Sequence, residues 1–380
     1  MTYPKLDTNA PTLRFDAGAL VRPIVHDLPR YVPATLPAER PGKLIKLDMN
    51  ESPFGPSPKA QNAIASFSAT NRYPDFAQLE LREALARYLE VPVAQIMAGA
   101  GLDDVLNSLM LLLIDDGDEV IISEPTFGVY RSLVALHGGT IVNQPLSSAP
   151  DFRPDPEAIL AAVTPRTKLV IICNPNNPTG NLFDAEIIEQ IIEGAPCLVV
   201  VDEAYAEFAG VSHLALLDRY TNLAVLRTMS KFAGLAGLRA GYGAFPADLM
   251  PYLMRVAPPF LNISAISAAA VIASLDDLPH LMANVALTVS ARERLAEELR
   301  QIPWIVPFAS ATNFLLVQLP VDDAGPIVAT LAGQGVFVRH FRKPELGLRN
   351  CLRVSIGTQE ELAVFVDELN AALNAGRMTP

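Results

Sequence analysis

The chain has few cysteines and histidines, and neither residue type is spaced for a metal site or a redox pair. The three cysteines, Cys173, Cys197 and Cys351, lie far apart and form no C-x-x-C motif, so we expect reduced thiols in a cytosolic protein. The five histidines form no H-E-x-x-H motif and no cluster. A cytoplasmic protein without a metal site is therefore expected.

Positive charge and long apolar runs are also scarce. The formal net charge is −12, which disfavours nucleic acids and anionic membranes as partners because both require a basic face. The longest apolar stretches, 109–114 and 263–275, are too short to cross a bilayer. The N-terminal segment lacks the apolar centre of a signal peptide. The expected partners are small molecules.

Half of the 380 residues are apolar, so the chain can bury a large core and form more than one domain. Residues 1–45 are rich in proline and predict an extended arm. We expect a large domain at 46–270 and a smaller α+β domain at 271–380, with the first strand as an alternative member of the smaller one. A long helical region is expected at about 268–301.

Short apolar strands alternate with helical segments from residue 119 to 245. Strands that read as uninterrupted Val, Ile and Leu are typical of a mostly parallel sheet covered by helices on both faces. The sequence therefore predicts an α/β fold. Such folds bind ligands at the carboxyl ends of the strands.

Lys231 follows one of these apolar strands and stands among small and apolar residues. Desolvation lowers the pKa of an ammonium group, so a free amine suited to Schiff-base chemistry becomes accessible near neutral pH. The alternative for this residue taken alone is an ordinary loop lysine.

A pair of glycines, Gly99 and Gly101, precedes an apolar helix for which Asp103 is the expected N-cap. The free N–H groups of Leu102 and Asp103 and the positive helix end suit a phosphate. A dinucleotide-binding turn is the alternative, but Asp104 stands where the third glycine of G-x-G-x-x-G should be. A nicotinamide dehydrogenase is therefore disfavoured.

Further candidates follow three other strands. Phe127 can lie on a flat ring, or be an ordinary core residue. Asn177, in the rigid turn N-P-N-N-P-T-G, presents a neutral amide. Asp202 ends an apolar strand, where a buried carboxylate requires a cationic partner, unless it caps a helix.

Six motifs occur in the order typical of fold-type I pyridoxal-phosphate aminotransferases: G-x-G-L-D-D, P-T-F, N-P-N-N-P-T-G, D-E-A-Y, S-K and G-L-R. The segment N-E-S-P-F-G-P-S resembles N-E-N-P-Y-G-P-S of histidinol-phosphate aminotransferases, from which Ser52 and Phe54 differ. The resemblance covers residues 43–365. It implies the fold-type I architecture and pyridoxal 5'-phosphate as the cofactor.

The resemblance also implies a role for each matching residue. Lys231 carries the cofactor and transfers the proton, Asp202 faces the ring nitrogen, and Tyr205 and Asn177 bind the phenolic oxygen. Phe127 stacks on the ring. The cofactor phosphate is bound by Gly101, Leu102, Asp103, Thr228, Ser230 and Arg239, and by Tyr73 of a partner subunit.

For the substrate, the resemblance points to Arg353 and Arg339, although a solvated arginine on a strand face is the alternative for both. Tyr31 and Asn50 are further candidates. The role of Tyr73 and the proline-rich arm implies a homodimer.

Histidinol-phosphate aminotransferases use 2-oxoglutarate in histidine biosynthesis, and this is the activity the resemblance implies. An aromatic amino acid aminotransferase and a threonine-phosphate decarboxylase share the same motifs and stay open. A non-catalytic cofactor-binding module of a transcriptional regulator is a more distant alternative, because it requires a basic helix-turn-helix segment.

Overall fold

The computed structural model describes residue 19 and residues 21–28, 44–256 and 262–377. It divides into two units, 1–31 and 32–380. The described part of the first unit holds the short helix α2 (Pro23–Asp27). Most of the predicted arm, and the substrate candidate Tyr31, lie outside the described residues. All elements below belong to the second unit.

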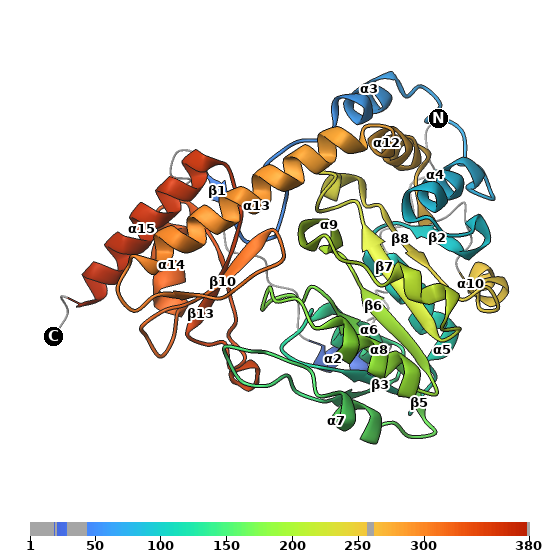
Figure 1. Cartoon of the computed structure of the whole chain (residues 1–380), viewed down its shortest axis with the longest axis horizontal. Helices are drawn as coiled ribbons and strands as arrows, with labels where there is room; N and C mark the ends of the chain where they lie inside the picture. Colours follow the sequence, from blue (N-terminus) through green and yellow to red (C-terminus); the bar gives the residue numbers. More distant parts are fainter. Residues whose placement is uncertain (1–18, 20, 29–43, 257–261, 378–380) are drawn as a thin grey trace, which may run out of the picture. The chain divides into compact units, whose positions relative to one another are not determined.

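A seven-stranded sheet forms the centre of this unit (Figure 1), in the order β2-β8-β7-β6-β5-β3-β4. Strand β8 is antiparallel to both of its neighbours, and the other strands pair in parallel. The mostly parallel sheet predicted from the sequence is confirmed. The strands are β2 (Ile96–Gly99), β3 (Glu119–Ile122), β4 (Thr140–Asn143), β5 (Thr167–Cys173), β6 (Leu198–Asp202), β7 (Leu223–Thr228) and β8 (Gly241–Ala244).

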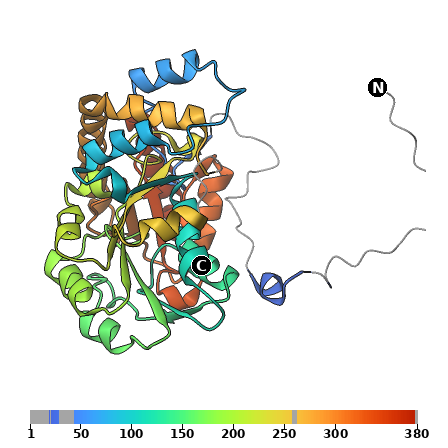
Figure 2. The ribbon, with the colours of Figure 1, turned by 90° about the vertical axis from the view of Figure 1, so that its right-hand side faces the viewer.

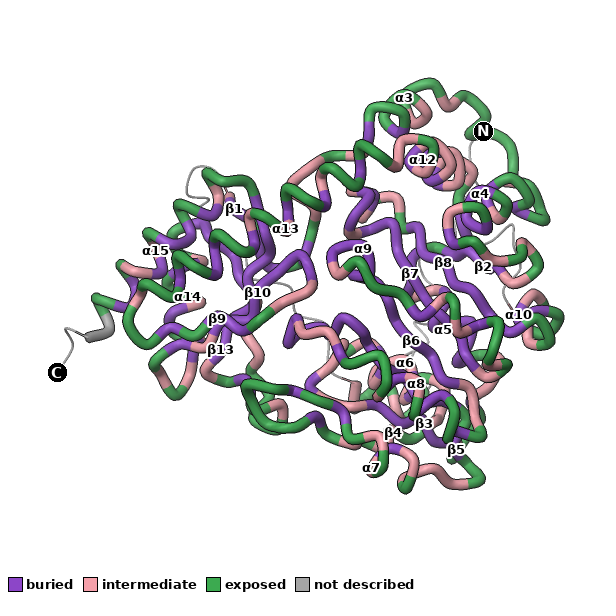
Figure 3. Tube along the Cα trace, in the orientation of Figure 1, coloured by how far each residue is buried: buried purple, intermediate pink, exposed green. Residues whose placement is uncertain are grey.

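The central strands of this sheet are buried (Figure 3) because helices cover them. Apolar residues of the helices and of the sheet form one large core. The helices of this region are α3 (Pro58–Ser66), α4 (Leu79–Leu89), α5 (Leu102–Leu113), α6 (Val129–Leu136), α7 (Pro156–Ala161), α8 (Ala185–Gly194), α9 (Ala206–Ala209), α10 (Met250–Val256) and α12 (Ala265–Leu275).

A second core lies among the C-terminal elements, which Figure 2 shows behind the green and yellow strands. Strand β1 (Ile45–Lys46) pairs in parallel with β11 (Val336–Phe337). A four-stranded antiparallel sheet has the order β12-β13-β10-β9. It comprises β9 (Val306–Pro307), β10 (Phe314–Gln318), β12 (Arg339–His340) and β13 (Cys351–Ser355), and the helices there are α14 (Gly325–Gly333) and α15 (Gln359–Arg377).

Helix α13 (Leu278–Arg300) contributes to both cores, with Leu281 in the first and Leu295 in the second. The helical region predicted at about 268–301 consists of two helices, α12 and α13, with a bend of 80° between them. Among the described residues, no single helix is long and apolar enough to cross a membrane. The bent pair of α12 and α13 together has the length and composition of such a span, and it resembles one in these two respects only. The domain boundaries stay a prediction.

Candidate active site

Lys231 lies beyond the carboxyl end of β7. The turn is fixed by Thr228, whose Oγ1 accepts a hydrogen bond from the Ser230 N–H at 3.1 Å. The Lys231 Nζ donates to the Met49 carbonyl at 3.1 Å and lies 6.0 Å from the Tyr205 ring centroid. Burial lowers the pKa of Lys231 to about 8. The amine therefore loses its proton at only mildly alkaline pH.

Asp202 ends β6 and is 2 % exposed. Its Oδ2 accepts from the Tyr130 hydroxyl, and its Oδ1 accepts from the Ala204 N–H at 3.0 Å. Within the described parts of the chain, no basic side chain forms an ion pair with it. Burial raises the pKa of this carboxyl to about 6. The helix-cap alternative is wrong, because the N-cap of α9 is Tyr205.

Asn50 and Tyr205 are in direct contact. The Asn50 Nδ2 donates to the Tyr205 hydroxyl at 2.9 Å, and both residues are buried. Asn50 is itself held by two groups of the C-terminal region, since its N–H donates to Ser355 Oγ at 2.8 Å and its carbonyl accepts from Asn313 Nδ2 at 3.0 Å. A predicted substrate residue thus meets a predicted cofactor residue.

Arg353 lies within β13 and is 8 % exposed, so the solvated alternative is wrong for this arginine. Its Nη1 donates to Asn177 Oδ1 at 2.6 Å and its Nη2 to the Asp48 carbonyl at 2.7 Å. Because the amide oxygen of Asn177 is already bonded, its NH₂ group is left to donate to a ligand. Arg339 of β12 stands opposite Arg353 in register and is partly exposed.

Helix α5 begins at Leu102, with Gly101 as its N-cap, so the prediction of Asp103 as the N-cap is wrong. Asp104 instead bonds back to the preceding turn, its Oδ2 accepting from the Ala100 N–H at 2.9 Å. The N–H groups of Leu102 and Asp103 occupy the first positions of the helix, which have no partner within it. They meet no acceptor in the described residues.

Arg239 lies beside this helix start. Its Nη2 binds Asp103 Oδ2 at 3.1 Å. A Cβ atom added at Gly101 would lie 2.5 Å from that same Nη2, and one added at Gly241 would lie 2.2 Å from the Leu102 nitrogen. Glycine at both positions therefore leaves room for the guanidinium and the helix N–H groups to converge.

The two aromatic candidates, Phe127 and Tyr73, differ in how far they are buried. Phe127 is partly buried just before α6, and its ring meets Tyr130 edge-on at 5.5 Å. Tyr73 is 85 % exposed. The sequence analysis missed Tyr130, whose hydroxyl contacts Asp202.

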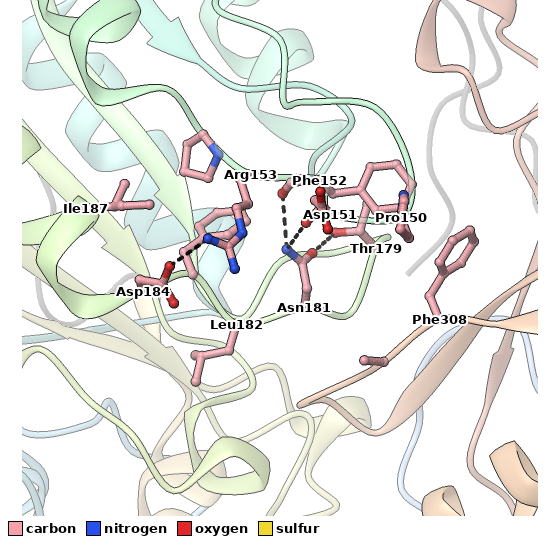
Figure 4. Close-up of a pocket in the computed structure, with 13 residues that line it drawn as sticks. Pro150, Asp151, Phe152, Arg153, Thr179, Asn181, Leu182, Asp184, Ile187 and Phe308 are labelled. Carbon is pink, nitrogen blue, oxygen red and sulfur yellow. Dashed lines mark hydrogen bonds and ion pairs between the residues drawn. The ribbon is translucent and has the colours of Figure 1, made fainter.

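A cavity of about 170 Å³ lies elsewhere (Figure 4). Arg153 pairs with Asp184 across it, and Asn181 donates to the carbonyls of Asp151 and Phe152. None of the site residues predicted from the sequence lines it. Thr179 of the N-P-N-N-P-T-G turn lines this cavity.

Comparison with known proteins identifies the family. Residues 42–369 match the family model for aminotransferase class I and II. The chain belongs to this aminotransferase family. It is 41 % identical to histidinol-phosphate aminotransferase of Dehalococcoides mccartyi, over 86 % of this chain and 90 % of that protein. It is 36 % identical to the chloroplastic enzyme of that name from Nicotiana plumbaginifolia, over 91 % of this chain and 85 % of that protein.

A solved aminotransferase has the same fold. The structure is histidinol-phosphate aminotransferase from Sinorhizobium meliloti in complex with pyridoxal-5'-phosphate, with a TM-score of 0.84 and 31 % identity over 93 % of this chain and 98 % of that one. The fold-type I architecture, the enzyme class and the pyridoxal-phosphate dependence of the family, all expected from the sequence, are confirmed.

The residues of this aminotransferase fit the cofactor on three structural observations. Asp202 is a buried carboxylate with no cationic partner among the described residues, and a protonated ring nitrogen would supply one. Lys231 is an amine whose pKa is lowered to about 8. The start of α5, with Arg239 beside it, offers donors of the kind that bind a phosphate.

Proposed function

We propose that this aminotransferase transfers the amino group of L-histidinol phosphate to 2-oxoglutarate, in histidine biosynthesis. The substrate assignment rests on the relatives to which this chain is similar. Eight of them, 36–41 % identical to this chain, are histidinol-phosphate aminotransferases. The paired position of Arg339 and Arg353 supports it, because two guanidinium groups suit a substrate phosphate.

Pyridoxal phosphate, when bound, supplies a ring that accepts the electron pair released at the substrate carbon. Lys231 acts as the base that removes the proton from the α-carbon of the substrate, and as the acid that returns it. Its lowered pKa makes the free amine available. Asp202 would hold the proton of the ring nitrogen of a bound cofactor, and Tyr205 and Asn177 would donate to its phenolic oxygen.

The other cofactor roles are part of the same proposal. Phe127 would stack on the ring of a bound cofactor. The cofactor phosphate would be bound by the hydroxyls of Thr228 and Ser230, the Arg239 guanidinium and the start of α5 at Gly101, Leu102 and Asp103. Asn50 lies on the substrate side, where it also holds Tyr205.

We further propose a cytoplasmic homodimer in which Tyr73 completes the phosphate site of the partner subunit. The exposure of Tyr73 (85 %) and of nearby Phe76 (64 %) supports an interface there. Free cysteines, of which Cys173 and Cys351 are buried, are consistent with a reducing compartment. Sedimentation of the active enzyme at several concentrations tests the dimer, and an active monomer would contradict it.

A substrate panel separates the proposed activity from its rivals. Histidinol phosphate, aromatic amino acids and threonine phosphate are each supplied with 2-oxoglutarate, and both ketone and carbon dioxide are measured. We expect ketone from histidinol phosphate at the highest kcat/KM and no carbon dioxide. Release of carbon dioxide would identify a decarboxylase, and a preference for aromatic amino acids would identify the other aminotransferase.

Lys231→Ala tests the proposed base. We expect loss of turnover because the variant lacks the amine that is proposed to move the α-carbon proton. Lys168→Ala is the control, since Lys168 is an exposed lysine paired with Asp118 at 3.6 Å on β5. Turnover by Lys231→Ala at the rate of this control would show that the base is another group.

A further inference from the structure

Tyr130 connects two residues of the proposed cofactor site. It is fully buried on α6, and its hydroxyl donates to Asp202 Oδ2 at 2.5 Å. Its ring meets the ring of Phe127 at 5.5 Å and at 86°. One side chain therefore contacts both the acid proposed for the ring nitrogen and the aromatic residue proposed for the ring face.

The surroundings of Asp202 make this hydrogen bond important. Cys173 stands opposite Asp202 on β5, Asp103 acts on it from α5, and Glu203 follows it in the chain. The two acidic neighbours oppose ionisation of the carboxyl group, and so does burial. Two hydrogen bonds favour the carboxylate, from the Ala204 N–H and from the Tyr130 hydroxyl. Of these two, the Tyr130 bond is the one that a substitution can remove.

We infer that Tyr130 is a positioning residue that keeps Asp202 ionised and oriented toward the ring nitrogen of the cofactor. The inference rests on the proposed role of Asp202. A donor to a carboxylate stabilises its charged form, and removing that donor from a buried site leaves the charge less compensated. Tyr130→Phe should therefore make Asp202 harder to ionise while preserving the ring that packs on Phe127.

Tyr242 offers a matched control. It is 1 % exposed on β8 of the same sheet, and its hydroxyl has no hydrogen-bond partner among the described residues. Tyr242→Phe removes the same oxygen from an equally buried tyrosine without removing a bond to Asp202. Any effect specific to Tyr130→Phe then reports on the lost bond and not on the loss of a buried hydroxyl.

The first readout is the titration of Asp202 in the full chain freed of cofactor. Aspartate labelled with ¹³C at the carboxyl carbon is followed by NMR, and the Asp202 signal is assigned by its absence in Asp202→Asn. We expect Tyr130→Phe to raise the titration midpoint by about one pH unit, and Tyr242→Phe to leave it unchanged. Equal midpoints in the two variants would overturn the inference.

A second variant covers the case in which Tyr130→Phe does not fold. Replacing Tyr130 by 3-fluorotyrosine keeps the ring and the hydroxyl but makes the hydroxyl a stronger donor. The midpoint of Asp202 should then fall below that of the unmodified protein. A midpoint that does not fall would equally overturn the inference.

Cofactor affinity is the second readout, measured by equilibrium dialysis with pyridoxal phosphate. We expect Tyr130→Phe to bind about tenfold more weakly than Tyr242→Phe, and Asp202→Ala to bind more weakly still. If Asp202→Ala binds the cofactor normally, the proposed role of Asp202 is wrong, and with it the cofactor part of this inference. If only Asp202→Ala loses affinity and the midpoints are equal, the role of Asp202 stands and that of Tyr130 does not.

Discussion

A hydrogen bond of 2.6 Å from Arg353 Nη1 to Asn177 Oδ1 connects the four-stranded sheet to the seven-stranded sheet. Arg353 belongs to β13 of the four-stranded sheet, and Asn177 to the turn that follows β5 of the seven-stranded sheet. The other end of the guanidinium binds the Asp48 carbonyl. The fork of donors that would meet an anionic substrate is therefore oriented by groups from both sides of the site.

Arg353→Lys should weaken substrate binding although it preserves the charge. A lysine has one ammonium group and cannot reproduce two donors at the fixed spacing of a guanidinium. We expect KM for the amine substrate to rise about 10- to 100-fold, the equivalent of one or two charged hydrogen bonds. Steady-state kinetics check this, with Arg300→Lys as the control, because Arg300 is half-exposed at the end of α13. An unchanged KM would place the substrate anion elsewhere.

Lys231 should make the stability of the cofactor-free protein depend on pH. Its pKa is about 8 in the folded protein and 10.5 when unperturbed. Between these values the unfolded chain binds more protons than the folded one, so the free energy of unfolding contributed by this group rises with pH from about 8 to 10.5. Denaturant unfolding of the unmodified protein and of Lys231→Met is measured across this range. The free energy of unfolding of the unmodified protein minus that of the variant should increase with pH. A constant difference would contradict the lowered pKa.

The principal residues of the site could be predicted because each follows a recognisable strand. Asp202 ends β6, and Asn177 and Lys231 lie in the turns that follow β5 and β7, and all three strands are largely apolar. Parallel strands place their carboxyl ends at one edge of the sheet, so residues far apart in the chain meet there. The fold class followed from the same pattern.

The missed features depend on the backbone and on local geometry. The carbonyls of Asp48 and Met49, which receive Arg353 and Lys231, exist in every residue and leave no sequence signal. The start of α4 at Leu79 is set by Gln78, whose φ of 49° is incompatible with a helix. Such a conformation is fixed by packing and not by residue type.

Arg227 should be essential for stability. It lies between two buried carboxylates, with Nη2 at 2.9 Å from Glu203 Oε2 and Nη1 at 3.3 Å from Glu207 Oε1. Arg227→Met leaves these charges buried without their cation, which typically costs about 3–5 kcal/mol. Arg300→Met removes only the exposed pair with Glu297 and should cost about 1 kcal/mol or less. Denaturant unfolding of the two variants compares them, and equal losses would show that the buried network does not depend on Arg227.

Gly101 should be required for cofactor affinity more than for stability. Gly101 and Gly117 both have a positive φ, 93° and 84°, so alanine at either position strains the backbone by about 1–3 kcal/mol. They differ in their surroundings, because a Cβ atom at Gly101 would lie 2.5 Å from Arg239 Nη2, whereas one at Gly117 meets nothing within 4 Å. Since Arg239 is half-exposed and can move away, Gly101→Ala should displace the guanidinium and leave the fold intact. We expect both variants to lose similar stability in thermal unfolding, and only Gly101→Ala to bind pyridoxal phosphate about tenfold more weakly. Equal affinities would show that Arg239 does not hold the cofactor phosphate from its position beside α5.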